Sequence, residues 1–290
     1  MRTSLRALMP VLALLLLSST AIAAPGDLDM SFADGGAAIT KFADRYGVAV
    51  SVGVQADGRI VVAGTMRQNL ASQSDFALAR YTANGHLDDT FGGDGRVLTD
   101  FGGRSDEAFG LALQPDGKAV VVGRTLDDLA VTRYRMDGSL DPTFSRNGRL
   151  VLDIDGPDTA YGVAVQSNGK IVVVGRAGQD FAVLRLHPGG KRDRTFGLRG
   201  LVRTDFAGSF DVARAVDIDA AGRIVVGGSA MVEAAQRGDF ALARYDRHGT
   251  LDGSFGTGGL VTTDFLSFED GITGLVALPS GGVVASGHAE

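Results

Sequence analysis

The sequence predicts an all-β protein built from about five copies of one four-stranded unit. Glycine supplies 42 of the 290 residues, about twice its usual share, so the chain must turn often. The apolar residues form short aliphatic runs and do not follow helical spacing. One motif also recurs at a nearly constant period, which indicates a tandem repeat.

The recurring motif is Asp-x-(Ser/Thr)-Phe, and its phenylalanines lie 59, 53, 52 and 59 residues apart. It occupies residues 29–32, 88–91, 141–144, 193–196 and 252–255. Aspartate, serine and threonine readily form local hydrogen bonds from side chain to backbone, so we interpret the motif as shaping five equivalent turns. The phenylalanines are expected to pack between adjacent units.

Each unit contains four segments with the length and composition of strands. The first ends in Thr-Asp-Phe or a relative, and we expect it to be the inner strand of its own unit. The second and third are aliphatic and are separated by Asp-Gly, Asn-Gly or a related pair. Such a pair predicts an antiparallel hairpin in which both turn residues accept positive φ. The fourth segment resembles residues 76–81 and precedes another glycine turn.

The second and third segments are nearly continuously apolar, so both faces of these strands should be covered. A sandwich would leave one face in water, and a parallel β-solenoid uses only about 20 to 30 residues per coil. The pattern therefore predicts a β-propeller, or an open arc of about five four-stranded blades. The last blade is expected to lack its outer strand, because residues 250–290 contain no counterpart of residues 76–81.

The units, for example LDDTFGGDGRVLTDFGG and the residues that follow it between 87 and 138, resemble the bacterial delta-60 repeat family. That family is also described as a propeller-like domain of unknown function. The resemblance covers residues 26–287 and implies a propeller-type fold in an exported bacterial protein. It implies no activity, because the family has no established catalytic residues.

The first 23 residues have the features of a secretory signal peptide: Arg2 and Arg6, an apolar run of about ten residues, and a small-x-small cleavage site ending at Ala23. The run is too short for a membrane anchor, so no membrane span is expected after cleavage. We predict a repeat domain over residues 24–290, exported to the periplasm or the cell exterior. Its units are expected at about residues 26–85, 86–138, 139–190, 191–249 and 250–290.

Composition narrows the possible chemistry. Without cysteine, the chain can form no disulfide, thiolate metal site or cysteine nucleophile. The 34 acidic residues outnumber the 28 Lys and Arg, and no basic stripe is present, which makes nucleic acid an unsuitable partner. The four histidines fall in different repeat positions, and no nucleophile elbow or phosphate-binding loop occurs. We therefore predict no catalytic residue, no metal ligand and no cofactor.

A second column of aspartates ends four of the first segments, at Asp100, Asp153, Asp205 and Asp264. These carboxylates could face a channel and hold a hard cation. Lysine replaces aspartate at this position in the first unit, as Lys41. We therefore favour strand-end capping, or pairing with a column of arginines formed by Arg80, Arg133, Arg185 and Arg244.

Two longer loops interrupt the repeat at residues 65–75 and 229–239, and their middles could form short helices. Since repeats supply a scaffold and loops supply recognition, these insertions are the candidate binding sites, although a tolerated insertion is the simpler alternative. The candidate residues are Met66, Arg67, Gln68, Asn69, Glu233, Gln236 and Arg237.

Uniform repetition without an asymmetric polar cluster predicts an exported, non-enzymatic binding or surface-interaction scaffold. Its partner would be an unknown protein or glycan. Two alternatives stay open. One is a propeller enzyme of the metal-dependent hydrolase type, and the other is a shortened member of a longer repeat array without activity of its own.

Overall fold

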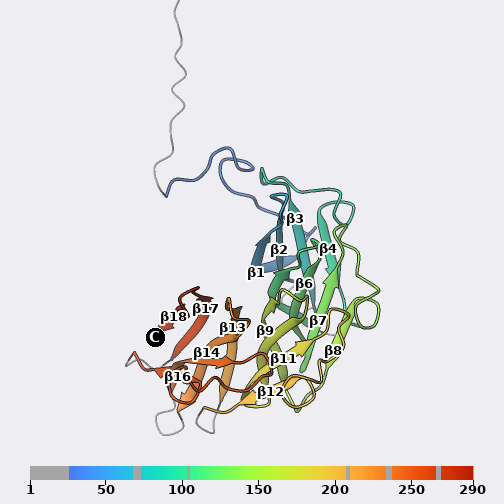
Figure 1. Cartoon of the computed structure of the whole chain (residues 1–290). Helices are drawn as coiled ribbons and strands as arrows, with labels where there is room; N and C mark the ends of the chain where they lie inside the picture. Colours follow the sequence, from blue (N-terminus) through green and yellow to red (C-terminus); the bar gives the residue numbers. More distant parts are fainter. Residues whose placement is uncertain are drawn as a thin grey trace, which may run out of the picture. The chain divides into compact units, whose positions relative to one another are not determined.

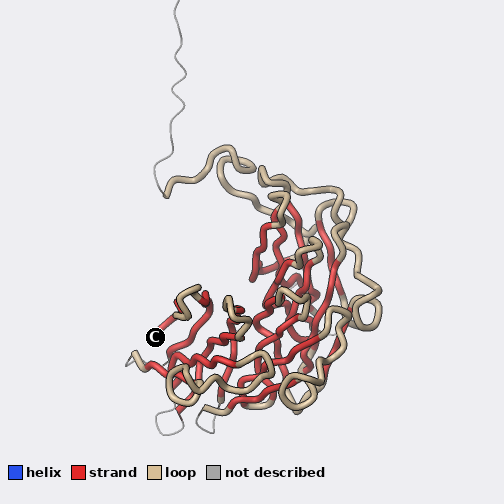
Figure 2. The backbone as a smooth tube through the Cα atoms, viewed as in Figure 1, coloured by secondary structure: helices blue, strands red, loops and turns tan. Residues whose placement is uncertain are grey.

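The computed structural model describes residues 26–67, 73–102, 105–206, 210–232, 237–265 and 269–289. These residues form strands, turns and loops (Figure 2). Within them, no helix has the length and apolar character needed to cross a bilayer. The expected signal peptide, residues 1–23, lies outside the described residues.

The chain divides into two compact units, Met1–Ala38 and Ile39–Glu290. In the described part of the first unit, the motif at residues 29–32 forms a turn. The backbone N–H of Ser31 donates to the Asp29 carboxylate over 2.9 Å, and the N–H of Phe32 donates to the Asp29 carbonyl over 2.9 Å. This is the Asx turn that the motif predicts.

The second unit contains four four-stranded antiparallel sheets and one two-stranded sheet among its described residues (Figure 1). Blade 1 consists of β1 (Tyr46–Val54), β2 (Ile60–Arg67), β3 (Ser74–Tyr81) and β4 (Arg96–Thr99), in that order. Blade 2 consists of β5 (Asp106–Leu113), β6 (Ala119–Thr125), β7 (Asp128–Tyr134) and β8 (Arg149–Leu152). Blade 3 consists of β9 (Asp158–Val165), β10 (Ile171–Ala177), β11 (Asp180–Leu186) and β12 (Leu201–Thr204).

Blade 4 consists of β13 (Asp211–Ile218), β14 (Ile224–Val232), β15 (Arg237–Tyr245) and β16 (Leu260–Thr263). Blade 5 has two strands in the described residues, β17 (Asp270–Ala277) and β18 (Val283–Ala289). The prediction of an all-β, propeller-like repeat is confirmed. The last blade was expected to lack only its outer strand, but it has two strands in the described residues.

One part of the strand assignment was wrong. The segment ending in Thr-Asp-Phe was expected to be the inner strand of its own unit, but it is the outermost strand of the preceding blade. Phe76 pairs with Thr99 across β3 and β4, and Phe181 pairs with Thr204 across β11 and β12. Each blade is therefore completed by the first segment of the following repeat.

The predicted hairpins between the two innermost strands are present, but their turn chemistry differs from the expectation. In blade 2 the N–H of Gln114 donates to the Lys118 carbonyl over 2.8 Å, which leaves a three-residue loop. Gly117 alone has a left-handed backbone there, with φ of +79°, and Asp116 does not. A three-residue hairpin loop needs positive φ at only one residue, which here is Gly117. Asp116 therefore keeps an ordinary φ, and its side chain can accept a hydrogen bond within the turn.

Adjacent blades cover one another with apolar side chains, as the continuous aliphatic strands predict. Between blades 1 and 2 a single buried cluster joins Val61, Phe76 and Leu78 to Val121 and Tyr134. The next two junctions have equivalent clusters. The motif phenylalanines Phe91, Phe144 and Phe196 belong to these clusters and are at most 2% exposed, which confirms that they pack between units.

Close approach of the backbones requires glycine in the second strand of each blade. At Gly175 an added Cβ would lie 1.8 Å from the carbonyl oxygen of Thr159 on the neighbouring strand. The pairing register shifts at this point, between Val174 and Gly175. The glycine thus accompanies a β-bulge that bends the inner hairpin, and the same shift occurs in the other blades.

Candidate functional site

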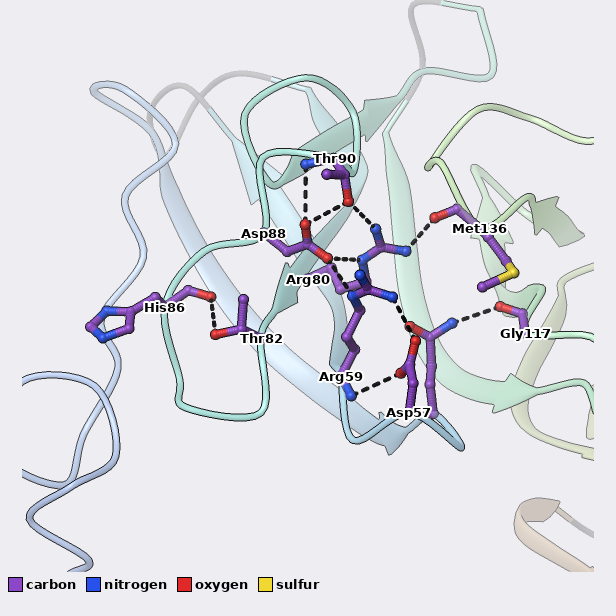
Figure 3. A network of polar contacts seen from close by, with 10 residues as sticks. Asp57, Arg59, Arg80, Thr82, His86, Asp88, Thr90, Gly117 and Met136 are labelled. Atoms are coloured by element: carbon purple, nitrogen blue, oxygen red, sulfur yellow. Dashed lines mark hydrogen bonds and ion pairs between the residues drawn. The ribbon is translucent and has the colours of Figure 1, made fainter.

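The buried polar groups of the blades form a repeated clasp around the column of arginines. In blade 1 the Nε of Arg80 donates to Oδ2 of Asp88 over 2.9 Å, and a second guanidinium nitrogen donates to the Met136 carbonyl of the next unit (Figure 3). Asp88 Oδ1 accepts from the Thr90 backbone N–H at 3.1 Å and from its hydroxyl at 2.6 Å. The guanidinium also lies over the ring of Phe91, 4.8 Å from its centroid.

The same clasp recurs in the next three blades, where the Nε of arginine donates to the motif aspartate. The pairs are Arg133–Asp141 at 3.0 Å, Arg185–Asp193 at 2.8 Å and Arg244–Asp252 at 2.9 Å. Burial alone would raise the pKa of Asp141, but hydrogen bonds from Thr143 and the charge of Arg133 outweigh it and lower the pKa to about 2. The motif aspartates therefore shape turns, as predicted, and they also bind the arginines, which was not predicted.

The expected pairing of these arginines with Asp100, Asp153, Asp205 and Asp264 is wrong, because the arginines bind the motif aspartates instead. The other expectation for that column, strand-end capping, holds at Asp100. There Oδ1 accepts the backbone N–H of Gly102 over 2.7 Å, immediately beyond β4.

At each junction between blades there are three aspartates, which come from three different elements. One lies near the start of the third strand, one follows the outermost strand, and one begins the inner strand of the next blade. The four sets are Asp75, Asp100 and Asp106; Asp128, Asp153 and Asp158; Asp180, Asp205 and Asp211; and Asp239, Asp264 and Asp270. Only the column of Asp100, Asp153, Asp205 and Asp264 was predicted from the sequence; the other two columns were not.

The third aspartate of each set is buried and closes the connection between blades. Oδ2 of Asp106 accepts the Phe101 backbone N–H over 2.7 Å, and Asp211 and Asp270 accept equivalent bonds over 2.8 Å. Burial and the nearby charge of Asp205 raise the pKa of Asp211 to about 6. For Asp106, burial is again the largest cause of a raised pKa, and Asp100 and Asp75 add to it.

Two of the four sets bring their carboxylates into a tight group. In the set of Asp75, Asp100 and Asp106, and in that of Asp239, Asp264 and Asp270, one oxygen of each residue lies within 4.8 Å of the others. Both sets belong to the blades whose second and third strands are joined by the longer loop. Hairpin length therefore separates these two sets from the other two.

The inserted loops, predicted as binding sites, are described only in part. Met66 and Arg67 end β2, opposite Asp75 and Ser74, so the expected short helices are wrong for the described residues there and for Ala230–Val232 of β14. Met66 is half-buried against blade 1, whereas Arg67 is exposed. Gln68, Asn69, Glu233 and Gln236 lie outside the described residues, and Arg237 begins β15.

The histidine contacts that the structure describes lie in or beside turns. His187 Nε2 lies 3.6 Å from Asp193 of the third clasp, and His248 accepts a bond from the neighbouring Arg247 over 3.0 Å. Neither contact forms a geometry for metal binding or acid–base work.

One exposed apolar strand among the described residues, β1, was not predicted from the sequence. In β1 the residues Tyr46, Val48, Val52 and Val54 are between 61% and 66% exposed. The corresponding residues of β5, for example Leu111 and Leu113, pack in the cluster between blades 1 and 2. Val54 also lines a hollow at the hairpin ends of the first three blades, together with Leu113, Met136 and Val165. We refer to Tyr46, Val48, Val50, Val52 and Val54 as the β1 stripe; the bulge at Val50 places Val52 and Val54 on one face of the strand and Tyr46 and Val48 on the other.

One property distinguishes β1 from the inner strands of the other blades. Its sequence, YGVAVSVGV, contains no charged residue, whereas β5, β9, β13 and β17 each contain aspartate. Like those strands, β1 lies at the edge of its sheet, hydrogen-bonded to β2 on one side only. Exposed apolar edges are normally protected by charge or proline.

Comparison with known proteins agrees with the fold. Residues 55–91, 114–144, 166–196 and 222–255 match the model of a family described as "Domain of unknown function (DUF5122) beta-propeller". No curated protein matches the chain. A virginiamycin B lyase from Staphylococcus aureus is similar at 9% identity and a TM-score of 0.43, covering 80% of this chain and 77% of that one.

Two further solved structures show comparable similarity. A protein from Lactobacillus plantarum has 13% identity and a TM-score of 0.42, covering 82% of this chain and 76% of that one. Sqt1 from Chaetomium thermophilum has 15% identity and a TM-score of 0.37, covering 81% and 76%. The four family matches and the strand order of the blades show that this chain is a repeat protein of the β-propeller type.

Proposed function

We propose that this protein is an exported, non-enzymatic binding scaffold with delta-60 repeats, and that it binds an extended segment of a partner protein along β1. The single observation that supports the site is the β1 stripe, a charge-free edge strand whose valines are exposed. A sheet edge supplies unpaired backbone groups, and a partner strand that adds to it gains main-chain hydrogen bonds. Alternate aliphatic side chains then provide specificity.

The surroundings of β1 favour a peptide over a glycan. Glycan sites depend on polar groups, whereas the most exposed side chains of β1 are apolar. The hollow that continues from Val54 adds Leu113 and Val165, together with polar residues such as Gln114 and Gln166. Contiguous exposed apolar surface is typical of protein interaction sites. The partner segment should therefore alternate aliphatic and polar residues, so that its aliphatic face covers Val52 and Val54, which share one face of β1.

The test uses the mature chain, residues 24–290, immobilised and panned against a phage-displayed library of random 12-residue peptides, with a glycan array as the second probe. We expect enrichment of peptides with alternating aliphatic residues. The double variant Val52→Lys, Val54→Lys should no longer bind these peptides, because the two lysine charges oppose the addition of a partner strand.

Leu198→Lys is the matched control, since Leu198 is an exposed apolar residue outside β1, at 81% exposure. This variant should bind the enriched peptides as well as the wild type does. Equal binding by the β1 variant, or binding to glycans alone, would contradict the proposal.

Export is tested separately by fractionating cells and sequencing the N-terminus of the recovered protein. The proposal expects protein outside the cytoplasm that begins at Ala24. Recovery of a cytoplasmic chain that retains residues 1–23 would contradict export without bearing on the β1 site.

A further inference from the structure

We infer that Asp75, Asp100, Asp106 and Thr125 form a calcium site that joins blade 1 to blade 2. Asp75 comes from β3, Asp100 follows β4, and Asp106 begins β5. One carboxylate oxygen of each aspartate lies within 4.8 Å of the others. The three elements belong to two different blades, so an ion bound here would contact both.

An unpaired buried group next to the carboxylates supports a missing ligand. Thr125 pairs with Asp106 across β5 and β6, and its hydroxyl is buried, with the residue 4% exposed. Neither Oγ1 of Thr125 nor Oδ1 of Asp106 has a hydrogen-bond partner. Oδ1 is also unpaired at Asp158 and Asp211, so the buried hydroxyl of Thr125 is what sets the first junction apart. Buried polar atoms are seldom left unpaired, and an ion between these two oxygens would satisfy both.

The charges of the group also leave room for a divalent ion. Among the described residues, Arg45 donates to Asp75 over 2.9 Å and supplies one positive charge against the three carboxylates. A bound divalent cation would bring the formal sum of these charges to zero.

The spacing of the oxygens suits calcium. Calcium binds oxygen ligands at about 2.3–2.6 Å, so two ligands on opposite sides of the ion can lie up to about 5 Å apart. The limit of 4.8 Å falls within that range. Magnesium needs ligands at about 2.0–2.1 Å and rarely gives up its water, so it should bind more weakly. Water would complete the coordination on the exposed side, where Asp100 lies.

The sites at the other junctions provide internal comparisons. At the position of Thr125 the third and fourth blades have Ala177 and Ala230, which offer no oxygen ligand. The aspartates of the second junction, among them Asp153, share the sequence columns but do not form a tight group among the described residues. The first junction therefore combines aspartate columns common to all junctions, a tight carboxylate group that it shares with the fourth, and a threonine where the fourth has Ala289.

The experiment measures calcium binding to the mature chain, residues 24–290, after EDTA treatment and dialysis. Isothermal titration with calcium chloride should give saturable binding, with magnesium chloride binding at least tenfold more weakly. The melting temperature should rise by about 5 °C or more when calcium exceeds its Kd by 100-fold.

Two variants locate the ion. Asp100→Asn should remove one equivalent of bound calcium, and Thr125→Ala should weaken that equivalent by about three- to tenfold. Asp100 is exposed, so its variant should melt like the wild type in EDTA, which separates loss of binding from loss of folding.

Asp153→Asn is the matched control in the same sequence column, and it should bind calcium with wild-type stoichiometry. Identical melting in calcium and EDTA would overturn the inference. So would an Asp100→Asn variant that binds as many equivalents as the wild type, or an equal loss in the Asp153→Asn control. None of these results depends on peptide binding at β1.

Discussion

The Nε of Arg133 donates to Oδ2 of Asp141 over 3.0 Å, and both side chains are almost completely buried. A further guanidinium nitrogen donates to the Pro188 carbonyl of the following unit. One arginine therefore connects its own blade, the motif turn and the next repeat. Such a buried pair stabilises chiefly because removing one member leaves the other charged and unpaired.

We expect Arg133→Met to lower the free energy of unfolding by about 3–5 kcal/mol, since Asp141 would lose its principal partner. Urea denaturation followed by circular dichroism measures the change. Arg96→Met breaks a pair with the exposed Asp94 and should cost less than about 1 kcal/mol. Similar losses in the two variants would show that the clasp contributes no more than a surface ion pair.

The buried carboxyl of Asp211 should make stability depend on pH. Its pKa is about 6 in the folded protein and about 3.9 in an unfolded chain, so the native state binds the extra proton. The free energy of unfolding should therefore fall by up to about 3 kcal/mol as the pH rises from about 4 to above 6.

In Asp211→Asn this contribution disappears, and the stability curve between pH 4 and 7 should be flatter by that amount. Chemical denaturation at several pH values provides the measurement. The exposed-carboxylate variant Asp94→Asn should keep the wild-type slope. Parallel curves for Asp211→Asn and the wild type would rule out a titrating Asp211.

Gly175→Ala should destabilise blade 3 by roughly 1–3 kcal/mol, because its Cβ would lie 1.8 Å from the Thr159 carbonyl and the backbone must move. At Gly253 an added Cβ meets nothing within 4 Å, and Gly253→Ala should leave stability nearly unchanged. Thermal melting of the two variants compares the same chemical change at a crowded and an open position. A neutral Gly175→Ala would mean that the bulge tolerates a side chain.

Phe144→Ala should cost about 3–5 kcal/mol, since the ring is fully buried between blades 2 and 3 and its removal leaves a cavity. Phe144→Leu, which fills most of the space, should recover more than half of the loss in urea denaturation. If leucine is no better than alanine, the contact of the ring with Arg133, at 4.9 Å, would account for the stabilisation.

Local patterns were sufficient to predict the strands and their hairpins. The aliphatic runs and the glycine turns predict β5 and β6 within a few residues, because hairpin pairing is decided by neighbours in sequence. The blade to which the Thr-Asp-Phe segment belongs was predicted wrongly for the opposite reason. Residues 96–99 have the same strand-like sequence whether they pair with β3 or with β5, and that choice depends on packing far along the chain.

The candidate sites show the same limit. Val52 and Val54 look like Leu111 and Leu113 in sequence, yet only the second pair is covered by a preceding blade. The aspartate columns are visible in the sequence, but the distance between their oxygens depends on how the longer hairpins carry β3 and β15 toward the next blade. Neither the burial of a strand by a neighbouring blade nor the distance between carboxylate oxygens can be predicted from the spacing of residues in the sequence.

Because the outermost strand of every complete blade comes from the following repeat, the junction of two repeats in the gene never coincides with the border of a sheet. Homologous recombination between equivalent codons of two units would excise or insert one whole period and still leave each remaining blade with four strands. The copy number of such a gene can thus drift without producing a half-paired sheet in the interior of the array. Selection would then act on the two terminal blades, where the gain or loss of a neighbour changes what is exposed.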